Sequence, residues 1–151
     1  MDEVSFLALG DWGLITKNQR DVAHQMAKVC NTITLDPSKQ VFVAAMGDNF
    51  YDEGVRDVDD PQWKEVFGDA YHGVQCPWYP ILGNHDWQGN VQAQLDFKGD
   101  SRWQMEALYY SKIIQNVHFF FLDTTTLCPD LSEMYTDKEF HEADMEVQLE
   151  W

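Results

Sequence analysis

Three short segments that begin with glycine carry side chains able to bind metal ions: Gly10–Gly13, Gly47–Tyr51 and Gly83–Asp86. Each follows an apolar run typical of a buried strand. Asp11 and Asp48 are 37 positions apart, and Asp48 and Asn84 are 36 apart, close to one βαβ unit of roughly 30 or more residues. Ligands of open α/β sheets bind beyond the carboxyl ends of the strands. The spacing therefore predicts that the three segments meet at one edge of a sheet.

The donor groups of these segments indicate which metals they suit. Asp11, Asp48 and Asn84 offer hard oxygen atoms, which favour Fe(III), Mn, Mg or a mixed iron–zinc pair over thiolate-binding metals. A carboxylate can bridge two ions, and two-metal hydrolases hold their ions about 3.5–4 Å apart. The phenol of Tyr51, with an ordinary pKa of about 10, binds only where a strong Lewis acid displaces its proton. The residues therefore predict a metal cluster that includes a trivalent ion.

Two further residues adjoin this set. His85 directly follows Asn84 and places an imidazole beside the predicted cluster. Asp86 is expected to accept a hydrogen bond from the His85 ring and to orient it, as carboxylates beside metal sites do.

Length and composition limit the classes of protein that fit. The 151 residues suit one domain, and 44% of them are hydrophobic. We expect no transmembrane segment, because no run of 18 apolar residues occurs. The residues after Met1 do not resemble a signal peptide. A net charge of −16 argues against nucleic acid or an anionic membrane as partner. The oligomeric state stays open.

The three cysteines, Cys30, Cys76 and Cys128, are too few for a disulfide scaffold and lack Cys-x-x-Cys spacing. Cys30 falls in a helical pattern and is assigned to the core, whereas Cys76 and Cys128 fall in loops. Their redox state stays open.

The order of the expected elements indicates an α/β fold, with a parallel β-α-β-α-β unit followed by a hairpin and a helix. Asn18 is expected to cap the first helix, whose apolar stripe is Val22, Met26, Val29 and Ile33. The expected strands are Val4–Leu9, Gln40–Met46 and Trp78–Leu82, the later helices Pro61–Tyr71, Gly89–Phe97 and Thr136–Trp151, and the hairpin arms Leu108–Ile114 and Val117–Asp123.

These residues resemble the calcineurin-like metallophosphoesterases, and most closely the purple acid phosphatases of the small, tartrate-resistant type. The resemblance covers essentially the whole chain. It implies the first half of a metallophosphoesterase αββα sandwich, so we expect residues 1–151 to form one such domain, truncated at its C-terminus. The matching segments are Leu9–Gly13, Gly47–Tyr51, Pro77–Tyr79, Gly83–Asp86, Gly89–Val91, Leu122–Thr124, Thr126–Cys128 and Gln148–Trp151.

The resemblance also implies roles for individual residues. Asp11, Asp48 and Tyr51 resemble ligands of the ferric ion, with Asp48 as the bridge to the second metal. Asn84 resembles a ligand of that second ion, which is Fe(II), Zn(II) or Mn(II). His85 resembles the catalytic histidine that contacts phosphate and protonates the leaving group. The implied activity is hydrolysis of phosphate monoesters at a dinuclear metal centre.

One departure from the family is clear. Such enzymes complete their site with three histidines from later Gly-His segments, and this sequence contains no Gly-His pair. The chain alone is therefore expected to be inactive. The alternative is a phosphatase-like scaffold that binds partners without turnover. By the same resemblance, the partner of Cys128 in a disulfide would lie later and be absent, and the compartment would be secreted, lysosomal or vacuolar.

Overall fold

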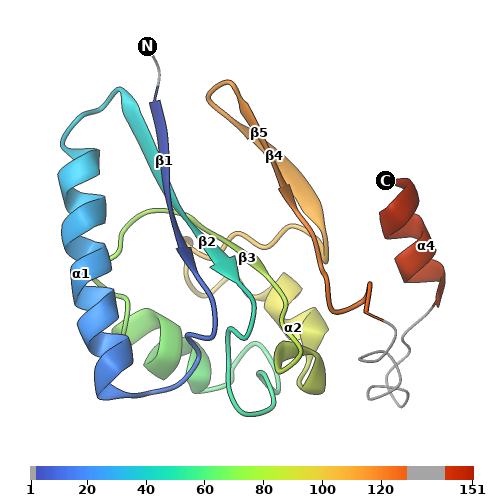
Figure 1. Cartoon of the computed structure of the whole chain (residues 1–151). Helices are drawn as coiled ribbons and strands as arrows, with labels where there is room; N and C mark the ends of the chain where they lie inside the picture. Colours follow the sequence, from blue (N-terminus) through green and yellow to red (C-terminus); the bar gives the residue numbers. More distant parts are fainter. Residues whose placement is uncertain (1–2, 129–141) are drawn as a thin grey trace.

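The computed structural model describes residues 3–128 and 142–151 and contains a three-stranded parallel sheet in the order β1-β2-β3 (Figure 1). The strands are β1 (Glu3–Leu9), β2 (Lys39–Met46) and β3 (Trp78–Ile81). Helix α1 (Lys17–Thr34) connects the first two, and the π-helical turn η1 (Trp63–Asp69) lies between β2 and β3. The predicted β-α-β-α-β unit is therefore confirmed.

The second half of the chain changes to local, antiparallel structure, as the sequence predicted. A hairpin of β4 (Tyr110–Ile114) and β5 (Val117–Phe121) turns at Gln115, which has a positive φ of 54°. Before it come the short helices η2 (Asp86–Gln88) and α2 (Val91–Asp96). Helix α4 (Glu142–Glu150) lies within the predicted C-terminal helix, whose first residues, 136–141, are outside the described part.

The central strand β2 is covered on both faces, whereas β1 is only partly covered and its Phe6 is 53% exposed. Alternate residues of β2 point to opposite sides, so Val41, Val43 and Ala45 pack with the α1 side and Phe42 and Ala44 with the hairpin side. The α1 side is the larger core and is rich in aromatic rings, including a stacked pair of Trp63 and Phe97 with centroids 3.7 Å apart. This packing fixes the strands whose carboxyl ends carry the candidate site.

Two predictions about α1 are wrong. Thr16, not Asn18, caps the helix, because its side-chain oxygen accepts a hydrogen bond from the backbone N–H of Gln19 at 3.1 Å. Val22 and Val29 are each 44% exposed. The buried face is instead Gln19, Ala23, Met26 and Cys30.

Gln19, the polar residue of that buried face, explains why α1 is rotated about its axis relative to the predicted orientation. The Gln19 amide donates to the backbone carbonyls of Trp12 at 3.0 Å and Val66 at 3.2 Å. These hydrogen bonds turn the helix so that small Ala23 approaches the sheet, while Val22 faces outward. Met26 is buried, as predicted.

Hydrogen bonds of the Gln148 side chain connect helix α4 to the segment that follows β5. The Gln148 side chain accepts from the backbone N–H of Asp123 at 2.9 Å and donates to its carbonyl at 3.0 Å. The neighbouring Leu149 is 68% exposed. Within residues 3–128 and 142–151, no helix is both long and apolar enough to cross a membrane.

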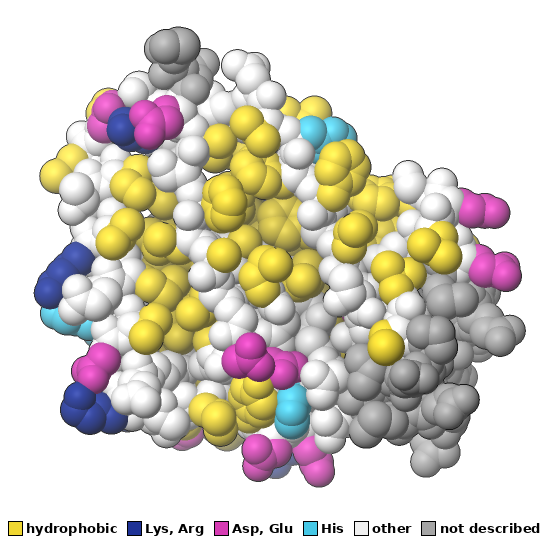
Figure 2. Space-filling model, viewed as in Figure 1, with side chains coloured by type: hydrophobic (Ala, Val, Ile, Leu, Met, Phe, Trp, Pro, Cys, Tyr) yellow, Lys and Arg dark blue, Asp and Glu magenta, His cyan; other side chains and the backbone are white. Residues whose placement is uncertain are grey.

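The outer face of the hairpin leaves large apolar side chains uncovered. Ile113 and Phe120 are 72% and 60% exposed. Hydrophobic side chains also gather on the face of the molecule that Figure 2 shows. We expect the chain to bind a hydrophobic dye and to self-associate at high concentration. An Ile113→Ser, Phe120→Ser variant should reduce dye fluorescence by about twofold. Val22→Ser, Val29→Ser on α1 is the matched control, and an equal effect of both variants would contradict the prediction.

Asp123 makes stability depend on pH. It is fully buried, and desolvation raises its pKa to about 6, although it accepts hydrogen bonds from Trp87 Nε1 and Thr125 N–H. A raised folded-state pKa contributes stability below the unfolded value near 4, and this contribution is lost as pH rises through about 6. Asp123 alone should therefore lower the free energy of unfolding by up to about 3 kcal/mol from pH 4 to 7, and Asp86 should add to this fall.

Denaturant titrations in chelator should show that Asp123→Asn removes part of this slope. Asp86, whose pKa burial also raises to about 6, retains the rest. Asp59→Asn, in an exposed loop, is the control and should leave the slope unchanged. An unchanged slope in Asp123→Asn would show that the buried carboxylate does not titrate in this range.

Candidate metal centre

The first two predicted ligands occupy strained backbone positions just beyond parallel strands. Asp11 lies two residues after β1 and Asp48 two residues after β2, with φ values of 53° and 51°. Positive φ is uncommon for residues other than glycine and costs free energy, so it persists where the surroundings impose it. Gly47, with φ of 90°, enables the second of these turns. The turns place both carboxylates at the same edge of the sheet.

A single phenol connects these carboxylates. The Tyr51 hydroxyl lies 2.9 Å from Asp11 Oδ1 and 2.8 Å from Asp48 Oδ2. Both carboxylates thus contact one oxygen atom, well within the separation that a shared two-metal cluster allows. Burial, followed by the hydrogen bonds to Asp48 and Asp11, raises the Tyr51 pKa above its ordinary value. In this arrangement the phenol is protonated.

The two oxygens of Asp48 have different neighbours. Oδ2 meets Tyr51, whereas Oδ1 accepts the backbone N–H of His85 at 3.1 Å. The carboxylate therefore extends from the first two segments toward the third. Asn84, half-buried in the turn after β3, makes no side-chain hydrogen bond with the described residues.

This close approach depends on Gly83. A Cβ added there would lie 2.2 Å from Asp48 Oδ1 and 2.3 Å from its backbone nitrogen. Only glycine therefore lets the turns after β2 and β3 come together in this way.

The His85 ring lies against Tyr51, with ring centroids 4.4 Å apart. Its Nδ1 contacts the backbone carbonyl oxygen of Asp52. A carbonyl only accepts hydrogen bonds, so this contact places the proton on Nδ1 and leaves Nε2 able to accept or deliver another.

The expectation that Asp86 orients the His85 ring is wrong, because Asp86 is fully buried and engaged elsewhere. Its carboxylate accepts the backbone N–H groups of Asn49, Phe50 and Gly83 at 2.9–3.2 Å. Burial is the main cause that raises its pKa to about 6. Asp86 thus holds in place the turns that carry the candidate ligands.

Sequence reasoning also missed two buried amides that extend this network. Gln94 donates to Asp86 at 2.9 Å, and Asn49 donates to the Ile81 carbonyl at 2.8 Å while accepting from Trp12 Nε1 at 3.1 Å. The available signal was the polar Gln94 on the core face of a short helix, next to Ala93.

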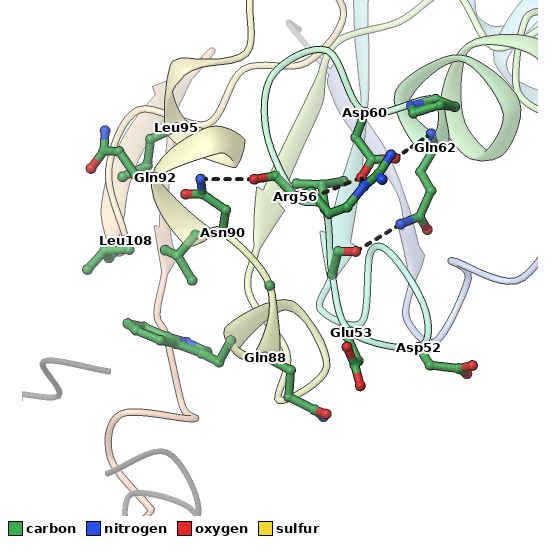
Figure 3. A pocket seen from close by; sticks show the side chains of 16 residues that line it. Asp52, Glu53, Arg56, Asp60, Gln62, Gln88, Asn90, Gln92, Leu95 and Leu108 are labelled. Atoms are coloured by element: carbon green, nitrogen blue, oxygen red, sulfur yellow. Dashed lines mark hydrogen bonds and ion pairs between the residues drawn. The ribbon is translucent and has the colours of Figure 1, made fainter. Parts of the chain in front are cut away.

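A pocket of about 1290 Å³ opens beside the centre, between the loop after Tyr51 and helix α2 (Figure 3). Its frame is fixed by hydrogen bonds: Arg56 pairs with buried Asp60 at 2.9 Å, and Asn90 donates to the Arg56 carbonyl at 3.1 Å. Figure 3 shows Asp52, Glu53 and Gln88 at one end of the pocket. Asp52 also carries the carbonyl that holds His85, so the pocket adjoins the candidate centre.

The donor set fits a hard metal ion. Asp11, Asp48 and Tyr51 direct oxygen atoms to one place, and such ligands suit Fe(III). No group of three His, Cys, Asp or Glu side chains with metal-binding arrangement occurs in the described part of the chain. The candidate ligands of the site are two carboxylates, one phenol and, in the adjoining turn, one amide.

Comparisons with known proteins identify the chain's relatives. The family described as calcineurin-like phosphoesterase matches residues 4–145. The chain is 40% identical over 147 residues to "Purple acid phosphatase 17" of Arabidopsis thaliana, covering 93% of this chain and 41% of that protein. It is 33% identical over 162 aligned positions to "Tartrate-resistant acid phosphatase type 5" of Homo sapiens, covering 97% and 49%.

The resemblance inferred from the three glycine-led segments is thereby confirmed. The chain spans less than half the length of these curated relatives. Because the family match extends over nearly all of the sequence, this protein belongs to the calcineurin-like phosphoesterase family.

Proposed function

We propose that this chain supplies part of a dinuclear metal site that hydrolyses phosphate monoesters. The observation that carries the proposal is the Tyr51 hydroxyl, which lies within hydrogen-bond distance of both Asp11 and Asp48 at the carboxyl edge of the sheet. The similarity to acid phosphatases of plants and mammals supports the same reaction class.

The residues divide between two ions in this proposal. Asp11, Asp48 and Tyr51 would hold Fe(III), and Asp48 with Asn84 would hold Fe(II), Zn(II) or Mn(II). The different neighbours of Asp48 Oδ1 and Oδ2 support its role as the bridge. When bound, two ions stabilise the attacking and leaving oxygens of an in-line displacement.

His85 is the proposed proton donor to the leaving group. Its Nδ1 is occupied by the Asp52 carbonyl, so Nε2 is the nitrogen that delivers a proton. The packing of its ring against Tyr51 keeps that nitrogen beside the centre. The adjoining pocket, which begins at Asp52, has room for the organic part of a monoester.

The chain alone is proposed to hold only one of the two ions firmly. Three donors serve the ferric position but only Asp48 and Asn84 the divalent one, and no Gly-His segment adds histidines. A trivalent ion is also attracted more strongly by anionic oxygens than a divalent ion is. Without the second ion the two-metal arrangement is incomplete, and turnover stays near background. The alternative function, a scaffold that binds partners, also predicts no catalytic turnover.

Loading the purified chain with Fe(III) and Zn(II) tests the proposal. We expect about one tightly bound iron per chain, less firmly held zinc and phosphate release near background. Inorganic phosphate should shift the absorption band of the iron-loaded chain, because an open position accepts the anion. Absence of iron binding would refute the metal site. Two firmly bound ions with rapid hydrolysis would show that the chain needs no further ligands.

Tyr51 should give the iron-loaded chain its colour through charge transfer from the phenolate. Tyr51→Phe removes the phenol oxygen, so the visible band should disappear and iron affinity should fall by at least about tenfold. Tyr109→Phe, away from the centre, is the matched control and should keep the band. A coloured Tyr51→Phe protein would exclude Tyr51 as a ligand.

Gly83→Ala should disturb the centre without removing any ligand. The added Cβ would collide with Asp48 Oδ1, so iron affinity should fall by about 10–100-fold, the range for changes beside a metal ligand. Gly10→Ala, whose Cβ would meet Met46 Cβ at an ordinary 3.6 Å, serves as control. Circular dichroism checks that both variants fold. Equal iron affinity in the two variants would contradict the role of Gly83.

A further inference from the structure

Two cysteines that play no part in the candidate site lie in direct contact. Cys30 Sγ and Cys76 Sγ are 3.0 Å apart, although the residues are 46 positions apart in the sequence. Both are buried, with 1% and 3% of their surface exposed. Cys30 belongs to the last turns of α1, and Cys76 precedes β3 at its amino end. The pair therefore lies at the edge of the sheet opposite the candidate metal centre.

The backbone on both sides of the pair is held in position. A Cβ added at Gly73 would lie 3.0 Å from Ala27 Cβ, so the segment that leads to Cys76 packs tightly on α1. Arg102 donates to the Val74 carbonyl at 3.0 Å. After Cys76, the Pro77 carbonyl accepts the backbone N–H of Val43 at 2.8 Å. Tertiary packing and hydrogen bonds therefore keep the two sulfur atoms together.

We propose that Cys30 and Cys76 form an intramolecular disulfide when the chain folds in an oxidising medium. Their separation exceeds the S–S bond length of about 2.05 Å by only about 1 Å. The bond would join α1 to the entrance of β3. Cross-linking residues so distant in sequence restricts the unfolded chain and stabilises the fold.

The chemistry requires a disulfide oxidant, such as oxidised glutathione. The Cys30 thiolate attacks one sulfur of the oxidant to form a mixed disulfide and expels the first thiolate. The Cys76 thiolate then attacks Cys30 Sγ and expels the second. Two electrons pass from the cysteine pair to the oxidant, and the two cysteine protons end on the two released thiols.

In the folded chain, the contact between the two sulfurs also shifts their pKa values in opposite directions. The hydrogen-bond contact with the Cys76 sulfur lowers the Cys30 pKa. The same contact and burial raise the Cys76 pKa. Since both sulfurs are buried in the folded chain, exchange takes place during folding, before α1 closes over the loop.

Counting free thiols tests the proposal directly. The denatured chain is refolded in a glutathione redox buffer, denatured again with an alkylating reagent and weighed by mass spectrometry. We expect one alkylated cysteine, the half-buried Cys128, and three after reduction. Cys128→Ser is the matched control, with none before reduction and two after. Peptide mapping should link the peptides that contain Cys30 and Cys76.

Stability gives a second, independent readout. Reduction should lower the melting temperature of the wild-type chain by about 4–10 °C. A Cys30→Ala, Cys76→Ala variant should melt at the same temperature with or without reductant. Three alkylated cysteines in the refolded wild-type chain, or a bond that involves Cys128, would overturn the proposal even if that variant failed to fold.

Discussion

One buried carboxylate holds together the two turns on which the candidate centre depends. Asp86 accepts backbone N–H groups from Asn49 and Phe50 after β2 and from Gly83 after β3. A buried charge is costly unless it is well hydrogen-bonded, and these donors offset much of that cost. The result is a separation so small that the side chain of Asp48 lies against Gly83. The positive φ of Asp48 persists because this network leaves its turn no relaxed alternative.

The sequence was sufficient to predict how the main elements are arranged. Buried strands recur about every 36 residues, and each is followed by Gly and a polar side chain. Few folds satisfy this pattern other than a sheet of parallel strands whose carboxyl ends lie at one edge. The structure has this sheet, and it brings Asp11, Asp48 and Tyr51 into contact. Both features follow from periodicity and spacing, which are local properties of the chain.

What the sequence did not reveal depends on contacts between distant segments. The apolar stripe of α1 was assigned to Val22 and Val29, yet the helix faces the core through Gln19 because Trp12 and Val66 offer it carbonyl acceptors. Asp86 was assigned to the neighbouring His85 ring, but it instead accepts backbone N–H groups of Asn49 and Phe50 from the turn after β2, and of Gly83 from its own turn. In both cases a polar side chain found buried partners that no periodic pattern encodes.

The same polar network links metal binding to the stability of the fold. Asp11 and Asp48 share one phenol, and the charge of Asp48 contributes to the raised pKa of Asp86. In a chain of net charge −16, negative groups held this closely repel one another. A cation bound at the proposed site would offset that repulsion in the folded state alone, because the unfolded chain does not assemble the donors, so its binding free energy would add to stability. With a cation bound at the proposed site, the strained turns and clustered carboxylates would therefore cost the fold less free energy than without it.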